Sequence, residues 1–100
     1  MPRLAARKDA NHVEIVRTLT ATGLHVTDLA QVGNGVPDLL VTGYSRNADA
    51  VLALLVEVKT PKGKLTDAEA KFFEKYPDDG PLIIARSADD VLRWFGKVTT

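Results

Sequence analysis

Two carboxylates and an amine stand at the ends of two apolar runs. Asp38 opens the run DLLVT, and Glu57 and Lys59 close the run LLVEVK. Apolar strands rarely carry charge, because moving an ion out of water is costly unless the ion is paired. Acidic and basic side chains at matching ends of two neighbouring strands therefore indicate a functional site.

A hairpin would bring these groups together. The two runs are separated by a loop rich in Gly, Ser, Asn and Asp, and a turn centred between Asn47 and Ala48 sets Asp38 opposite Glu57. Side chains alternate faces along a strand, so Glu57 and Lys59 share one face. Cross-strand partners have Cβ atoms about 4.5–5.5 Å apart. Two ionised carboxylates about 5 Å apart repel by about 3 kcal/mol at an effective dielectric of 20, so a positive group should lie between them.

A divalent cation would supply more of that charge than Lys59 alone. Ligation by carboxylate and water oxygens suits Mg²⁺ or Mn²⁺ better than Zn²⁺. Such an ion polarises a phosphate and lowers the pKa of a bound water, while an ammonium orients the water or neutralises developing charge. The three side chains therefore predict phosphodiester hydrolysis. The alternative is an ordinary ion-paired strand edge, worth under about 1 kcal/mol, which would not require Asp38 to face Glu57.

The first part of the chain must position these groups. It predicts a helix and three strands, over residues 9–22, 24–31, 38–42 and 51–58. In the helix, Val13, Val16 and Leu19 recur at helical spacing, and Gly23 stops the pattern. The third strand is apolar on both faces, which predicts a central strand covered on both sides.

The second part predicts a helix, a strand and a helix. Thr66 and Glu69 form a capping box that opens a helix ending by Pro77. The remaining elements are a buried strand over 81–85 and a last helix opened by Ser87 and Asp90 that carries Val91, Leu92 and Phe95. Because a helix separates the third strand from the fourth, the fourth can return parallel to a neighbour. The fold class is therefore α/β, with a small mixed sheet flanked by helices.

Composition limits the partners of the chain. One hundred residues, 45% hydrophobic and 26% charged, predict one domain spanning 1–100. Thirteen basic and thirteen acidic residues leave no net charge, which excludes the global basic signature of a nucleic-acid binder. The turn KTPKGK could contact a DNA phosphate through its lysines, or be an ordinary solvated loop. Local basic patches are formed by Arg3, Arg7 and Lys8, and by Lys59, Lys62 and Lys64.

Features that are absent from the sequence predict the cellular compartment of the protein. The absence of cysteine excludes a disulfide framework and thiolate metal sites. No apolar stretch approaches the roughly 20 residues that span a bilayer, and the start MPRLAARKDA lacks the apolar segment of a signal peptide. These features predict a cytoplasmic protein with no membrane partner.

The motif GVPDLLV followed by LLVEVKT resembles the PD-(D/E)XK nuclease superfamily, in particular the small stand-alone viral type called the VRR-NUC domain. With KLTDAEAKFF and the order of elements, the resemblance covers nearly the whole chain. It implies a restriction-endonuclease-like αβββαβ core with an extra C-terminal helix. It also implies that Asp38 and Glu57 bind the metal together with the Val58 carbonyl, and that Lys59 is the catalytic lysine.

The same resemblance implies a biological setting. A metal-dependent DNA endonuclease of this kind would cut branched, flapped or Holliday-junction DNA in phage-type replication, repair or recombination. The stand-alone relatives are homodimers, which would pair two cleavage centres. The resemblance therefore implies a homodimer in a bacterial or phage-infected cell.

The first helix departs from the superfamily's pattern. Relatives often carry an acid there, but at 100° per residue His12 falls within the apolar arc and Glu14 lies nearly opposite. His12 is expected either to bind the metal, to hydrogen-bond a water on it, or to be a satisfied core residue. Glu14 fits the third position after an Asn11 cap, which weakens it as a supporting residue. Glu69 stands where relatives usually have glutamine near the active site, and its capping box explains it equally well.

Two other functions stay open. Because His12 replaces an acid, the chain could be a non-catalytic DNA-binding module that retains the fold. A restriction-like enzyme with sequence specificity is the weaker interpretation, since no separate base-reading element is visible. Metal-dependent cutting of DNA separates the nuclease from the binding module.

Overall fold

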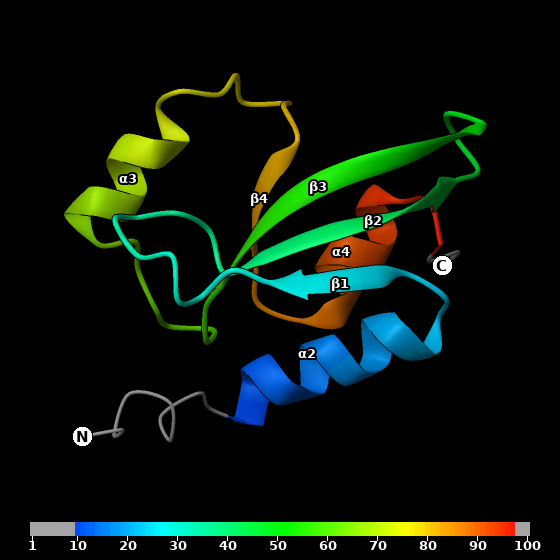
Figure 1. The fold of residues 1–100 in the computed structure, drawn as a ribbon, viewed down its shortest axis with the longest axis horizontal. Helices are drawn as coiled ribbons and strands as arrows, with labels where there is room; N and C mark the ends of the chain where they lie inside the picture. The colour runs from blue at the N-terminus through cyan, green and yellow to red at the C-terminus, as the bar shows by residue number, and fades with distance from the viewer. Residues whose placement is uncertain (1–9, 98–100) are drawn as a thin grey trace.

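The computed structural model describes residues 10–97, and its elements follow the predicted order of helices and strands (Figure 1). The helices are α2 (Ala10–Ala21), α3 (Asp67–Phe73) and α4 (Ala88–Trp94). The strands are β1 (His25–Asp28), β2 (Leu39–Ser45), β3 (Ala50–Val58) and β4 (Leu82–Ala85). The fold is α/β with a mixed sheet, as predicted.

The sheet has the strand order β1-β2-β3-β4. β1, β2 and β3 are antiparallel neighbours, and β4 returns parallel to β3 after α3. In the β2–β3 hairpin Leu39 lies opposite Val56 and Ser45 opposite Ala50, so the turn is centred where the sequence predicted it. β3 is a central strand, also as predicted. The confirmed register sets residue 38 beside residue 57.

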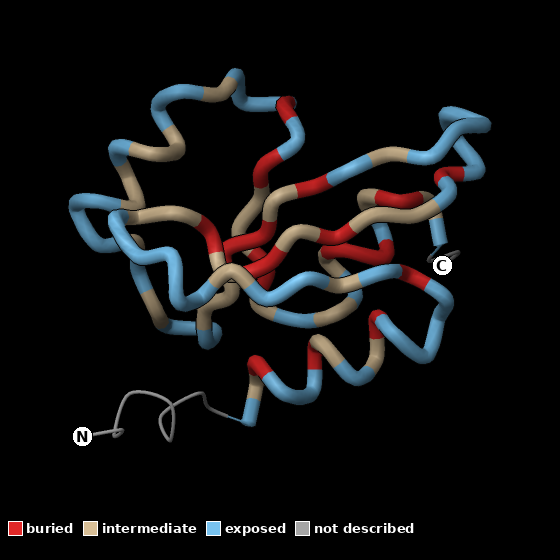
Figure 2. Tube along the Cα trace, viewed as in Figure 1, coloured by how far each residue is buried: buried red, intermediate tan, exposed pale blue. Residues whose placement is uncertain are grey.

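The hydrophobic core lies between one face of the sheet and the helices α2 and α4, which contact each other. Figure 2 shows the buried positions along the middle of β2 and β3 and on the inner side of α2. Alternation along the strands directs every second side chain of β2 and β3 into this layer. The fully buried members include Ile15, Leu19, Leu39, Val41, Leu54, Val56, Val91 and Phe95.

The opposite face of the sheet is less covered than predicted. In β3 the first half, Ala50–Ala53, is exposed or half-buried, and Val51 is 73% exposed. The second half is largely buried, from Leu54 to Glu57. The reason is the position of α3, which lies beyond one end of the sheet and buries none of its own residues (Figure 1). The prediction that both faces of β3 are covered is wrong for its first half.

The end of β1 and the inner face of α2 differ from the sequence expectation. β1 ends at Asp28, because the Asp28 carboxylate accepts a hydrogen bond from the Ala30 N–H at 2.8 Å and turns the chain. In α2, His12 is buried but Val13 is 43% exposed, so Val13 does not belong to the inner face. α3 ends at Phe73, before Pro77, as predicted.

No helix within 10–97 is long and apolar enough to cross a bilayer.

Candidate active site

Asp38 is held at the end of β3 by the main chain. Its Oδ2 accepts a hydrogen bond from the Val58 N–H at 2.9 Å, and its own carbonyl accepts one from the Leu29 N–H at 2.7 Å. The preceding Pro37 is fully buried and restricts the backbone that enters β2. These contacts place the Asp38 carboxylate beside Glu57, where the hairpin register predicted it.

Glu57 is a buried carboxylic acid in an acidic environment. It is 2% exposed, and its Oε1 has no hydrogen-bond partner among residues 10–97. Burial, followed by the charges of Asp38 and Glu69, raises the pKa of Glu57 to about 9, although Lys59 opposes the shift. Without an added cation the side chain is therefore protonated near neutral pH.

Lys59 faces the same carboxylates. Its Nζ lies 2.8 Å from Glu69 Oε1 and 3.6 Å from Glu57 Oε2, and its side chain is 16% exposed. Burial by itself would lower the pKa of Lys59, but the hydrogen bond to Glu69 and the charges of Glu69, Glu57 and Asp38 outweigh it and raise that pKa. Lys59 is therefore an ammonium at working pH and acts as a charge.

Glu69 serves both the helix and the site. Its Oε1 accepts a hydrogen bond from the Thr66 N–H at 2.8 Å, and its N–H donates to Thr66 Oγ1 at 3.2 Å, which completes the predicted capping box. Burial would raise the pKa of Glu69, but the hydrogen bonds from Lys59 and from the Thr66 N–H lower it on balance. The start of α3 thereby fixes the carboxylate that holds Lys59.

The donor set fits a hard divalent cation. Asp38 and Glu57 offer two carboxylates, and the main-chain carbonyl of Val58 lies between Glu57 and Lys59 in the sequence. Within residues 10–97, no three His, Cys, Asp or Glu side chains form a group that could hold an ion. Mg²⁺ and Mn²⁺ accept a few protein oxygens and complete their shell with water, so such a third side chain is not required. The partnerless, buried Oε1 of Glu57 is the observation that matches a cation here.

Comparison with known families agrees with this geometry. Residues 3–88 match the family model of the VRR-NUC domain. The chain belongs to the VRR-NUC domain family. It is thus a nuclease-family domain, and the matched region contains Asp38, Glu57, Lys59 and Glu69. No match was found among curated proteins or among solved structures.

Two main-chain contacts of this VRR-NUC domain fix the position of Lys59. The Lys59 N–H donates to the Ala85 carbonyl at 3.0 Å, and the Lys59 carbonyl accepts a hydrogen bond from the Asn11 side-chain amide at 3.0 Å. Because α2 begins at Ala10, Asn11 lies inside the first turn, and its expected role as the helix cap is wrong. Asn11 instead ties α2 to the end of β3. No sequence signal pointed to this contact, which joins residues 48 positions apart.

An arginine at the end of β4 holds the turn that follows Lys59 by hydrogen bonds. The sequence did not predict this role. Arg86 Nη1 donates to the carbonyls of Thr60 at 2.6 Å and Gly63 at 2.8 Å. Lys62 and Lys64 are both exposed on this turn. Arg86 therefore braces the segment that presents these two lysines. The other predicted DNA contacts, Arg7 and Lys8, lie outside the described residues.

The first helix of the VRR-NUC domain presents His12 to a different acid. His12 is 8% exposed, and its Nε2 lies 3.8 Å from Asp28 Oδ2. The two residues line a pocket of about 270 Å³ with Val13, Val16 and Arg17. This contact joins α2 to the end of β1. No pattern in the sequence predicts a role for Asp28.

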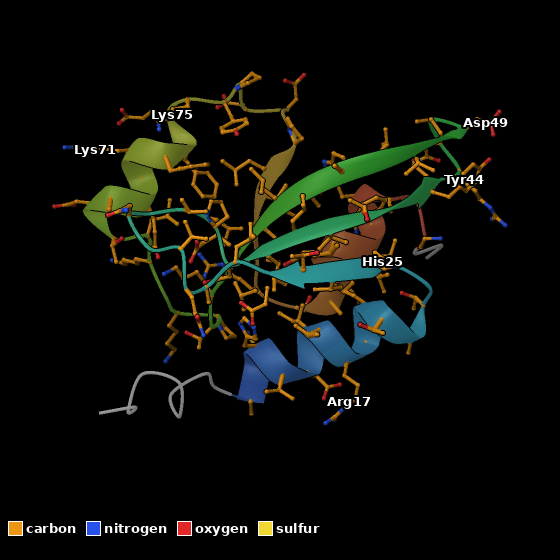
Figure 3. All side chains as sticks on the ribbon, viewed as in Figure 1. Arg17, His25, Tyr44, Asp49, Lys71 and Lys75 are labelled. Atoms are coloured by element: carbon orange, nitrogen blue, oxygen red, sulfur yellow. The ribbon has the colours of Figure 1, made fainter. Side chains whose placement is uncertain are left out.

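Glu14 lies on the outer side of α2. Its side chain is 65% exposed and contacts Arg17 Nη1 at 3.7 Å. It also accepts a hydrogen bond from Thr18 Oγ1 at 3.4 Å. Figure 3 shows Arg17 projecting away from the sheet. The contacts of Glu14 are thus within its own helix, as the helical wheel predicted.

Proposed function

We propose that this VRR-NUC domain is a Mg²⁺- or Mn²⁺-dependent DNA endonuclease that hydrolyses phosphodiester bonds. The observation that supports it most is the meeting of Asp38, Glu57 and Lys59 at one end of a buried hairpin. An ordinary strand edge has no reason to bury a carboxylate against a second one. A nuclease does, because the pair can share one cation.

Each residue has a distinct part in the proposed reaction. Asp38, Glu57 and the Val58 carbonyl would hold the ion, which when bound polarises the phosphate and acidifies a water. Lys59 keeps its charge and stabilises the negative charge that develops on the phosphate oxygens. Glu69 holds the Lys59 Nζ at 2.8 Å and so limits the positions the ammonium can adopt. The main chain fixes Asp38 through the Val58 N–H.

The proposed substrate is structured DNA. Lys62 and Lys64 would contact phosphates next to the site, with Arg7 and Lys8 as further contacts. Phosphate contacts position a protein on DNA but carry no sequence information directly. We therefore expect selection by shape, for branched, flapped or junction DNA of the kind met in phage-type replication, repair or recombination.

A homodimer is part of the proposal, because paired cleavage of two strands needs two centres. Light scattering at micromolar concentration should give twice the chain mass of 10.8 kDa. A mass of one chain would remove the support for paired cleavage.

A cleavage panel tests the activity itself. Supercoiled plasmid, linear duplex, flapped duplex and a four-way junction would each be incubated with Mg²⁺, Mn²⁺ or EDTA. We expect cutting with either ion, none in EDTA, and faster cutting of the branched substrates than of linear duplex. Equal rates on all four DNAs would contradict the shape selection, and no cutting with either ion would contradict the nuclease.

One observation favours the second candidate function, a DNA-binding module without catalysis. His12 contacts Asp28, so α2 brings no acid to the pair formed by Asp38 and Glu57. Binding of the four-way junction that is as tight in EDTA as in Mn²⁺, with no cutting, would support this function. Binding that strengthens with Mn²⁺ and is followed by cutting supports the nuclease.

A further inference from the structure

We propose that a groove along the outer edge of β4 binds a single strand of DNA that leaves the active site. This inference rests on the proposed nuclease function and adds a second binding surface to it. The groove has a volume of about 390 Å³, within the range of roughly 300–1,000 Å³ typical of ligand pockets. It is lined by Ile83, Ile84, Arg86, Asp90, Arg93 and Trp94.

The groove lies on the strand next to the one that carries Glu57. Ile84 lies opposite Glu57 in the parallel register of β3 and β4. β4, which forms one wall of the groove, is therefore the neighbour of the strand that carries the buried carboxylate. Arg86 belongs to the groove and also donates to the carbonyls of the Thr60–Gly63 turn. Arg86 therefore links the groove to the turn that carries Lys62 and Lys64.

The chemistry of the lining suits a single strand. Trp94 is half-buried beside the apolar Ile83, and an indole face accepts any base by stacking. Arg93 is exposed and carries the charge that a phosphate needs. Duplex DNA would not present unstacked bases to Trp94, so the occupant we commit to is single-stranded.

The acid in the groove is already engaged. One Asp90 oxygen, Oδ2, accepts the Arg86 N–H at 2.9 Å, and the other, Oδ1, lies 3.4 Å from Arg93 Nη1. The two guanidinium groups of Arg86 and Arg93 outnumber this single carboxylate. The lining therefore keeps a net positive charge, complementary to a phosphate backbone.

The first measurement follows the fluorescence of Trp94 as DNA binds. Trp94 is the only tryptophan in the chain, so its fluorescence reports on this groove alone. In EDTA, titration with a twenty-nucleotide oligo-dT strand should quench that fluorescence along the same curve as binding followed by anisotropy of the labelled strand. Saturated binding without quenching would overturn the proposal.

The second measurement uses matched variants. Arg93→Gln should weaken oligo-dT binding at least about threefold and lower the slope of log K against log salt by about 0.7. Arg17→Gln is the control, because Arg17 is also an exposed helical arginine that pairs with an acid three residues earlier. Equal effects of the two substitutions would contradict the groove, as would an Arg93→Gln protein that binds as tightly as wild type.

Different results would contradict the groove and the nuclease function. If the wild-type protein cuts DNA with Mg²⁺ or Mn²⁺ but Arg93→Gln binds oligo-dT normally, the groove is wrong and the nuclease stands. If oligo-dT quenches Trp94 and Arg93→Gln weakens binding while no DNA is cut, the groove is supported and the nuclease is wrong. Circular dichroism of both variants would confirm that each is folded.

Discussion

Replacing Lys59 with alanine should lower the rate of metal-dependent DNA cleavage at least about a hundredfold. Lys59 is the cation that faces Glu57 and Glu69, and its raised pKa keeps it charged at the pH of the assay. Removing a group that stabilises transition-state charge in a partly dry site typically costs two to three orders of magnitude. The measurement is single-turnover cleavage of the four-way junction with saturating Mn²⁺.

Substitution of a second lysine serves as the control for the loss of positive charge. Lys71 is exposed on α3 and projects away from the sheet (Figure 3), so Lys71→Ala removes the same charge at a distance. We expect the rate of that variant to stay within about twofold of wild type, because isolated surface charges contribute little. A Lys59→Ala protein that remains folded and cuts as fast as Lys71→Ala would contradict the role of Lys59.

The free energy of unfolding in EDTA should fall as the pH rises from 5 to 8, and should fall further for wild type than for Glu57→Gln. The ordinary pKa of a glutamate is 4.5, and the folded protein raises that of Glu57 to about 9. The folded state therefore holds a proton that the unfolded chain releases. The stabilising effect is complete below about pH 4.5 and is lost as the pH rises toward 9.

The size of this effect follows from the same shift. One pKa unit corresponds to 1.36 kcal/mol, so between pH 5 and pH 8 wild type should lose about 2–4 kcal/mol more than Glu57→Gln. Urea denaturation at several pH values measures the difference, and glutamine keeps the shape of the side chain. Parallel pH curves for the two proteins would contradict the buried acid. Mn²⁺ should restore the stability of wild type at pH 8, because it binds the ionised pair in the folded state.

The residues of the site were predictable because they share one hairpin. Apolar runs on both sides of a polar loop centred at Asn47 and Ala48 leave little freedom of register, since a slip of one residue would turn the apolar set to the wrong face. The sequence alone therefore predicts that Asp38 lies beside Glu57. The capping box of Thr66 and Glu69 was also local, within three residues, and the structure has it.

The supporting contacts were not predictable for the opposite reason. Asn11 and Arg86 donate hydrogen bonds to main-chain carbonyls more than twenty residues away. Every residue has a main-chain carbonyl, so the residue types do not indicate which one accepts such a bond. The pairing of His12 with Asp28 likewise depends on how α2 crosses the end of β1. The exposed half of β3 lies toward the β2–β3 turn, away from α3 (Figure 1).

Calorimetric titration of the metal-free protein with Mn²⁺ tests the central claim most directly. Asp38→Asn keeps an oxygen that can accept the Val58 N–H, so it removes a charge without removing that contact. Wild type should bind one ion per chain, and Asp38→Asn and Glu57→Gln should each bind it at least about tenfold more weakly. If either variant binds Mn²⁺ as tightly as wild type, the two carboxylates do not share a cation.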